Sequence, residues 1–182
     1  MSKLIYITSM SLDGYVEDAD GSIEWTIPKG VHEFVTELLR PMRTYLYGRR
    51  IYETMAYWEG EIESYAPEHR DFARVWQKAE KIVYSRTLTG LKIRNARLER
   101  DFDVEAIRKL KRESEQDIDI GGAELAGLAI AVDLVDECHL FVHPVVLGGG
   151  KPAFPAGLRR SLEILETSRF DTGVVHLHYR VA

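Results

Sequence analysis

The sequence predicts an α/β fold whose sheet is parallel for most of its length and antiparallel towards the C-terminus. Short apolar runs rich in β-branched residues alternate with stretches of helical period, as in strand–helix–strand units. From residue 138 onward, strand-like runs follow one another with no helical stretch between them. A chain of 182 residues is of the size of one domain, which we expect to span residues 1–182.

Each element is predicted from its own pattern. Apolar, β-branched runs predict strands at residues 3–9, 44–47, 81–85, 117–120, 138–147, 162–166 and 174–181. Apolar residues three and four apart predict helices at residues 31–40, 50–57, 72–80, 104–115 and 123–134. Pro144 lies inside one strand-like run and predicts an edge or a bulge there. The glycine-rich segment 148–157 is expected to be a loop.

Composition narrows the class of protein. The formal net charge of −5 argues against a nucleic-acid-binding surface, because phosphate backbones are bound by clustered lysine and arginine. Cys138 is the only cysteine, so the chain forms no internal disulfide and no cysteine-built zinc site. No segment resembles a signal peptide or a membrane span. We therefore expect a cytoplasmic protein with neither nucleic acid nor membrane as partner.

Three segments share one design, in which a predicted strand ends and a glycine or a small polar residue follows. They are Gly48-Arg49-Arg50-Ile51, Gly121-Gly122-Ala123-Glu124-Leu125 and Ser85-Arg86. Free amides at a helix start bind phosphate, and glycine allows a ligand to approach the backbone closely. Taken alone, each segment could instead be an ordinary turn or a polar strand end. Because ligands of open α/β sheets bind at the carboxyl ends of strands, the three together favour a nucleotide site.

Two further residues are candidates for the substrate side. Asp13, followed by Gly14 at the end of the first strand, could orient a substrate or assist proton transfer, or could simply be a turn aspartate. Trp25 could cover a pocket or fill part of the core.

The histidines of the C-terminal strands are candidates for a metal site. His139 and His143 share one strand face, and so do His176 and His178. Imidazole is a common metal ligand. The alternating apolar residues of the last strand nevertheless predict that its histidines face solvent or a second subunit. We therefore expect no bound metal.

Motifs along nearly the whole chain together resemble the dihydrofolate reductase-like superfamily. The chain looks closest to the reductase domain of the riboflavin-biosynthesis deaminase–reductases and their stand-alone relatives. The matching segments are Ser11-Leu12-Asp13-Gly14, Tyr47-Gly48-Arg49 with Glu53, Tyr84-Ser85, Ile120-Gly121-Gly122 and residues 144–152 with Phe154. The zinc-binding signature of the deaminase half is absent from the sequence.

The resemblance implies a three-layer α/β/α fold with a mixed sheet of about eight strands and NADPH along its carboxyl edge. By carry-over, Gly48, Arg49, Arg50 and Ile51 hold phosphates, and Ser85 and Arg86 face the adenosine 2′-phosphate. Gly121, Gly122, Ala123, Glu124 and Leu125 cradle the pyrophosphate. Ser9 and Val16 lie near the nicotinamide amide, and Asp13, Trp25 and Ile120 belong to the substrate side.

The expected activity is hydride transfer from NADPH to a C=N or C=O bond of a small heterocyclic metabolite, with Asp13 or an ordered water as proton donor. The leading assignment is 5-amino-6-(5-phosphoribosylamino)uracil reductase-like activity. Ile120 stands where the riboflavin-pathway domain usually has an acidic residue, which is more like dihydrofolate reductase. A pterin reductase and a non-catalytic nucleotide-binding module therefore stay open.

The alternating residues of the last strand also predict a homodimer, because an exposed strand can pair with a second copy of the chain. Light scattering of the purified protein is expected to give twice the mass of one chain. A monomer at working concentration would exclude this arrangement.

Overall fold

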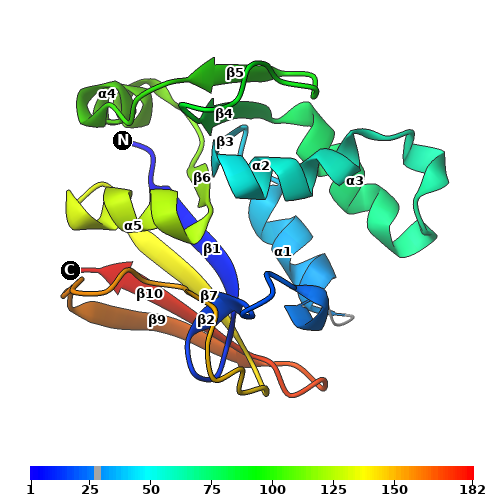
Figure 1. Ribbon diagram of the computed structural model, residues 1–182, viewed down its shortest axis with the longest axis vertical. Helices are drawn as coiled ribbons and strands as arrows, with labels where there is room; N and C mark the ends of the chain where they lie inside the picture. The colour runs from blue at the N-terminus through cyan, green and yellow to red at the C-terminus, as the bar shows by residue number, and fades with distance from the viewer. Residues whose placement is uncertain (27–29) are drawn as a thin grey trace.

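A computed structural model describes residues 1–26 and 30–182, and an eight-stranded sheet forms its centre (Figure 1). The strand order is β5-β4-β3-β6-β1-β7-β10-β9. Neighbours from β5 to β7 pair in parallel, whereas β7–β10 and β10–β9 are antiparallel. The strands are β1 Leu4–Ser11, β3 Thr44–Gly48, β4 Glu80–Tyr84, β5 Ala96–Glu99, β6 Ile118–Gly121, β7 Glu137–His143, β9 Leu162–Arg169 and β10 Val175–Val181. The fold is thus the mixed, mostly parallel one that the sequence predicts.

Helices cover both faces of this sheet (Figure 1). They are α1 Val31–Leu39, α2 Arg49–Met55, α3 Arg70–Lys78, α4 Val104–Glu113 and α5 Ala123–Ala131, with short 3₁₀ turns at Glu24–Thr26, Ala56–Glu59, Ile62–Ser64 and Pro67–His69. Residues of α4 and α5 pack into one apolar core, and residues of α1, α2 and α3 into the cores on the opposite face. Among the described residues, no helix is long and apolar enough to cross a membrane.

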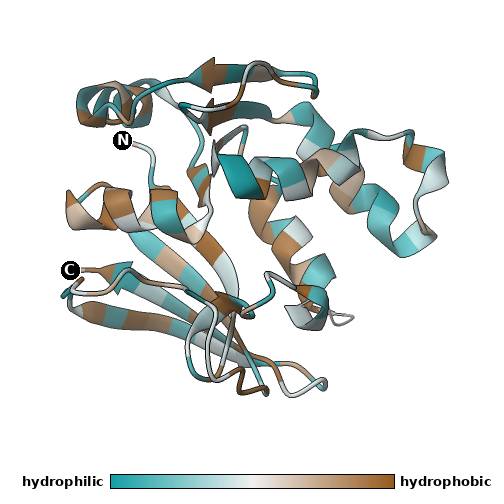
Figure 2. Cartoon of the chain, in the orientation of Figure 1, coloured by the Kyte–Doolittle hydropathy of each residue, from teal (hydrophilic) through white to brown (hydrophobic). Residues whose placement is uncertain are grey.

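Local sequence explains two of these helices well. The helix α5 is apolar along most of its length, as the hydrophobic colouring in Figure 2 shows, and it is largely buried between the sheet and a loop. A Cβ on Gly127 would lie 2.8 Å from Pro155, so the absence of a side chain lets the loop pack against the helix. Asp103 caps the N-terminus of helix α4, because its carboxylate accepts hydrogen bonds from the first-turn amides of Glu105 and Ala106.

The structure adds three short strands that the sequence patterns did not predict. The strand β5 lies at one sheet edge, and β2 (Tyr15–Glu17) pairs with β8 (Lys151–Pro152) in a separate two-stranded sheet. The expectation that segment 148–157 is entirely a loop is therefore wrong at β8. Such short strands carry too few residues for a pattern of alternation, and tertiary contacts decide them. Pro144 ends β7, so this strand is shorter than predicted.

The expectation that the histidines of the last strand face solvent or a second subunit is wrong for His176, which is fully buried, and the neighbouring His139 of β7 is buried as well. Their strands are covered on both faces, because α1 places Phe34 against the ring of His176. The Nδ1 atom of His139 lies 2.9 Å from Nε2 of His176, and burial lowers the pKa of His139 to about 3. The apolar alternation of β10 identified one core-facing side but could not show that the other side is also covered.

Asp119 is an ionisable residue in the interior of the sheet. It lies on the central strand β6, in register with Ile5 and Tyr45, and its Oδ1 atom has no hydrogen-bond partner among the described residues. Loss of hydration raises the pKa of this carboxyl to about 8. The folded protein therefore holds Asp119 protonated at neutral pH, whereas the unfolded chain releases that proton.

This difference predicts a pH-dependent stability. Because the folded pKa lies above the unfolded value, the contribution of Asp119 is greatest below the unfolded pKa and is lost as the pH rises towards about 8. Between about pH 5 and pH 7, the wild type should lose roughly 2.5 kcal/mol more unfolding free energy than Asp119→Asn, one proton per molecule being released on unfolding. Urea unfolding of both proteins at the two pH values measures this difference. Parallel profiles would contradict a neutral buried carboxyl.

Candidate functional site

The four strands β4, β3, β6 and β1 are neighbours and parallel, so their carboxyl ends lie side by side at one edge of the sheet (Figure 1). The three predicted nucleotide-binding turns follow β3, β4 and β6. The β3 and β6 turns are in close contact, since a Cβ on Gly122 would lie 3.8 Å from the amide nitrogen of Gly48. The structure therefore brings together the segments that the sequence singled out.

The β6–α5 turn is shaped by its two glycines. A Cβ on Gly121 would lie 2.9 Å from the ring of Tyr47, and Gly122 has a φ of 95°, which side-chain-bearing residues rarely adopt. No described side chain caps the N-terminus of α5, which begins at Ala123. First-turn amides of a helix have no partner within the helix. This turn therefore offers donors and a positive dipole end to an anion.

The β3–α2 turn supplies two cationic side chains. The guanidinium of Arg49 lies 2.8 Å from Glu53 and 2.9 Å from the hydroxyl of Thr87, which links this turn to the end of β4. Arg50 lies 3.1 Å from Glu17 of β2. Ile51 packs against the glycines of the β6–α5 turn, where its Cγ2 atom would lie 3.3 Å from a Cβ on Gly122. The arginines are exposed, so their ion pairs can exchange for a ligand at little cost.

At the end of β4, the two predicted residues make local contacts. The Oγ atom of Ser85 accepts hydrogen bonds from the amides of Thr87 and Leu88, and so shapes the turn. Arg86 forms an exposed ion pair with Asp101, at 2.6 Å. Arg100 reaches the same turn and donates hydrogen bonds to the carbonyl oxygens of Ser85 and Leu88. The sequence patterns did not identify Arg100.

Lys151 is a second residue that sequence reasoning did not place in the site. Its ammonium lies 2.7 Å from Glu124 in the first turn of α5, and only 17% of its side chain is exposed. Lys151 is paired with Glu17 across the β2–β8 sheet, and Glu17 in turn binds Arg50. Two ion pairs therefore connect the small sheet to α2 and α5. The signal in the sequence was a single lysine within the glycine- and proline-rich segment 148–157.

Asp13 ties two loops together. Its carboxylate accepts hydrogen bonds from the hydroxyl of Ser11 and from the amides of Leu147 and Gly148, at 2.7 to 3.1 Å. The hydrogen bond from Ser11 is the main cause that lowers the pKa of Asp13, which is therefore ionised at neutral pH. These contacts favour a role in fixing the loop after β7 over donation of a proton. Catalysis by Asp13 stays a prediction.

The other predicted substrate-side residues lie at different depths. Trp25 donates a hydrogen bond to the carbonyl of Ser22, and its ring meets the edge of His143, with 5.4 Å between centroids. The Nε2 atom of buried His143 has no hydrogen-bond partner among the described residues. Ile120 is fully buried in the core beneath α5, which favours a packing role.

The two residues predicted beside the nicotinamide lie on neighbouring parts of the chain. Ser9 is half-buried on β1, in register with Phe141 of β7, and Val16 is half-buried on β2. Between these two positions, the amide of Leu12 donates a hydrogen bond to the carbonyl oxygen of Val145 and so links the end of β1 to the loop after β7. Both positions are compatible with the predicted contact, which stays a prediction.

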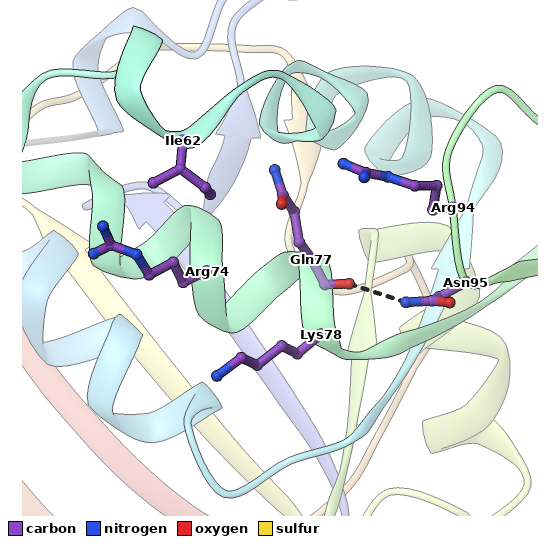
Figure 3. Close-up of a pocket in the computed structure, with 6 residues that line it drawn as sticks. All are labelled: Ile62, Arg74, Gln77, Lys78, Arg94 and Asn95. Atoms are coloured by element: carbon purple, nitrogen blue, oxygen red, sulfur yellow. Dashed lines mark hydrogen bonds between the residues drawn. The ribbon is translucent and has the colours of Figure 1, made fainter.

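A pocket of about 530 Å³ lies elsewhere on the molecule (Figure 3). It is formed by Arg74, Gln77 and Lys78 of α3 together with Ile62, Arg94 and Asn95. The side-chain amide of Asn95 donates a hydrogen bond to the carbonyl of Gln77, as the dashed line in Figure 3 shows. None of the residues predicted for the site lines this pocket, so we keep it separate from the carboxyl edge.

The strand order and the arrangement of helices are those of a dihydrofolate reductase-like domain. The family model described as the RibD C-terminal domain matches residues 2–176, and the chain belongs to this family. The curated protein YyaP of Bacillus subtilis (strain 168), which is uncharacterized, is 34% identical over 179 residues. That alignment covers 97% of this chain and 94% of YyaP.

Solved structures share the fold. A protein described as a riboflavin biosynthesis protein from Shewanella sp. PV-4 superposes with a TM-score of 0.79 at 20% identity, covering 99% of each chain. Acinetobacter baumannii RibD superposes with a TM-score of 0.74 at 15% identity, covering all of this chain and 58% of that chain. The deaminase–reductase of Thermotoga maritima gives 0.68 at 16% identity, again covering all of this chain and 57% of the other. The chain thus spans just over half the length of these two larger proteins.

The contact between β2 and the chain just before β8 predicts very different effects of alanine substitution at two adjacent glycines. A Cβ on Gly150 would lie 2.0 Å from the carbonyl oxygen of Glu17, and its φ is 130°, whereas a Cβ on Gly149 would meet nothing within 4 Å. We expect Gly150→Ala to lower the free energy of unfolding by about 2–4 kcal/mol, because the backbone at Glu17 or at residue 150 must move to admit the methyl group. Gly149→Ala is the matched control and should change it by less than about 0.5 kcal/mol. Equal effects in denaturant unfolding would show that the small sheet is not so tightly packed.

Proposed function

We propose that the protein is an NADPH-dependent reductase that transfers a hydride to a C=N or C=O bond of a small heterocyclic metabolite. The observation that carries this proposal is the contact between the β3–α2 and β6–α5 turns at the carboxyl edge of the sheet. There the uncapped start of α5, two arginines and Lys151 surround one small region. Membership of the RibD C-terminal domain family supports the same class of reaction.

The residues of this edge fit an anionic dinucleotide. Gly121 and Gly122 let their turn pack closely against Tyr47 and Ile51, and the amides of the first turn of α5 are donors for a pyrophosphate. Arg50 and Lys151 are held by Glu17 and Glu124, and a bound phosphate would compete for both cations. Arg49 and Arg86 approach the end of β4, where the 2′-phosphate of NADPH would lie. When bound, NADPH supplies the hydride.

The protein contributes position and charge to the reaction. Asp13 holds the loop after β7 beside the end of β1, so the floor of the substrate side is fixed before a ligand enters. A proton must follow the hydride. Because Asp13 is ionised, an ordered water is the better donor of the two that the sequence left open.

The substrate class that we propose first is that of 5-amino-6-(5-phosphoribosylamino)uracil, reduced at its ribose to a ribityl chain. Support comes from the structural likeness to the Thermotoga maritima protein, whose name includes a reductase of that compound. The alternative is a pterin reductase, which Ile120 in front of the two glycines favours. A homodimer is part of the proposal. The expectation that the last strand makes the contact is wrong, because β10 is paired with β7 and β9, so the sheet edge is β9, with exposed Leu162 and Ile164.

Cofactor discrimination tests this proposal. By calorimetric titration, we expect Arg49→Gln and Arg86→Gln each to weaken NADPH binding about tenfold, or about 1.4 kcal/mol, and NADH binding less than about twofold. Arg112→Gln is the control, because Arg112 is an exposed residue in the last turn of α4, which leads to the amino end of β6. Equal losses for both coenzymes would contradict the position assigned to the 2′-phosphate, and no heat from either coenzyme would overturn the proposal.

Turnover is then followed as NADPH oxidation with a panel of uracil-derived and pterin substrates. Oxidation with a member of either group identifies the substrate class. Binding of NADPH without oxidation in the whole panel would instead support a nucleotide-binding module that has lost catalysis.

A further inference from the structure

A second cluster of chemically competent side chains lies at the opposite end of the sheet from the nucleotide turns. Glu137 and His139 are two residues apart at the start of β7, so they project from the same face. On the neighbouring strand β10, His178 is directly opposite His139. The proposed reductase activity uses none of these three residues.

The ligand atoms of the cluster are already close to one another. One nitrogen of each imidazole and one carboxylate oxygen of Glu137 all lie within 4.8 Å of one another. The Nε2 atom of His178 is 3.0 Å from Oε2 of Glu137. Two ligands of one tetrahedral zinc ion are about 3.3 Å apart, because each lies about 2.0 Å from the metal. One edge of the coordination polyhedron therefore has nearly the required length in the metal-free protein.

The surroundings hold two of these ligands in place. Glu137 and His139 are both 5% exposed. The Nδ1 atom of His139 meets Nε2 of His176 at 2.9 Å, and the ring of His176 is packed against Phe141 and Phe34. A hydrogen bond from the second nitrogen of an imidazole typically orients a metal ligand and leaves its Nε2 atom for the ion.

The third ligand has room to adjust. The side chain of His178 is 18% exposed. Its ring is stacked on that of His139, with centroids 3.9 Å apart and an angle of 17° between planes. The ring of His178 must tilt for the two nitrogens to converge on one ion, and solvent on its outer side permits that movement.

Charges around the cluster allow a divalent cation. In the structure, Lys3 forms an ion pair with Glu137, and its ammonium lies 2.7 Å from Oε1 of that residue. Lys3 is half-exposed, so a metal ion can displace it into solvent. Arg180, opposite Glu137 on β10, is already paired with Glu163 of β9. Glu166 of β9 lies opposite His178 and adds a negative charge on that side.

We propose that Glu137, His139 and His178 bind one transition-metal ion of the zinc type, which cross-links β7 to β10. Two imidazoles and one carboxylate are a common ligand set for zinc. The fourth position is open to water. Cys138 contributes no ligand, because its side chain belongs to the core on the other face of β7. The site lies outside the nucleotide-binding edge, so its role is to stabilise the antiparallel part of the sheet.

The direct test is titration of the full chain with zinc chloride, and with cobalt chloride as a spectroscopic probe. We expect one zinc ion per chain, a higher melting temperature with zinc and the visible bands of tetrahedral or five-coordinate cobalt. His178→Ala should weaken zinc binding at least about tenfold and abolish the cobalt bands, because one of three protein ligands is lost. Circular dichroism checks that this partly exposed substitution leaves the fold intact.

A matched variant separates this site from adventitious binding to imidazole. The matched variant His69→Ala removes a histidine from the 3₁₀ turn before α3. The ring of His69 packs against Trp58, and both residues are far along the chain from the cluster. This variant should bind zinc as tightly as the wild type. Glu137→Gln should weaken zinc binding, and Lys3→Ala should strengthen it by removing the competing ammonium. Unchanged affinity in His178→Ala, or no saturable binding of zinc by the folded wild type, would overturn the proposal.

Discussion

The parallel pairing of β3 with β6 is the interaction on which the nucleotide site depends. It places Tyr47 beside Gly121, and only a residue without a side chain fits against that ring. The same contact brings the turn after β3 to within van der Waals distance of the turn after β6. Two segments more than seventy positions apart in the sequence thereby become one surface with backbone amides at its centre.

The position of the small β2–β8 sheet relative to the site is held by two ion pairs. Arg50 with Glu17, and Lys151 with Glu124, connect this sheet to the two helices that begin at the carboxyl edge. One partner of each pair, Arg50 or Glu124, is exposed, so each pair contributes only modestly to the stability of the fold. They are nevertheless informative about function, because they keep cations next to the helix start where phosphate would bind.

In the C-terminal half of the sheet, the alternation of apolar residues predicts which face each side chain lies on but not whether that face is buried. Period-two spacing correctly assigns His139, His176 and His178 to faces of their strands, but burial depends on what covers each face. Phe34 of α1 comes from another part of the chain and covers His176, so that His139 and His176 are buried while the partly exposed His178 stacks on His139. Pairing of β7 with β10 then sets the spacing between His178 and Glu137.

The sequence by itself determined the fold class, most helices and strands, and the turns at Gly48, Ser85 and Gly121, because each rests on local periodicity or on a glycine where the chain must turn. It did not determine which side chains meet. Contacts between distant segments decide four features: the position of Lys151 in the candidate site, the hydrogen bonds of Asp13 to the loop after β7, the burial of Ile120 and the neutral state of Asp119. Strand order decides those contacts, since hydration is lost and ion pairs form only once separate elements have packed together.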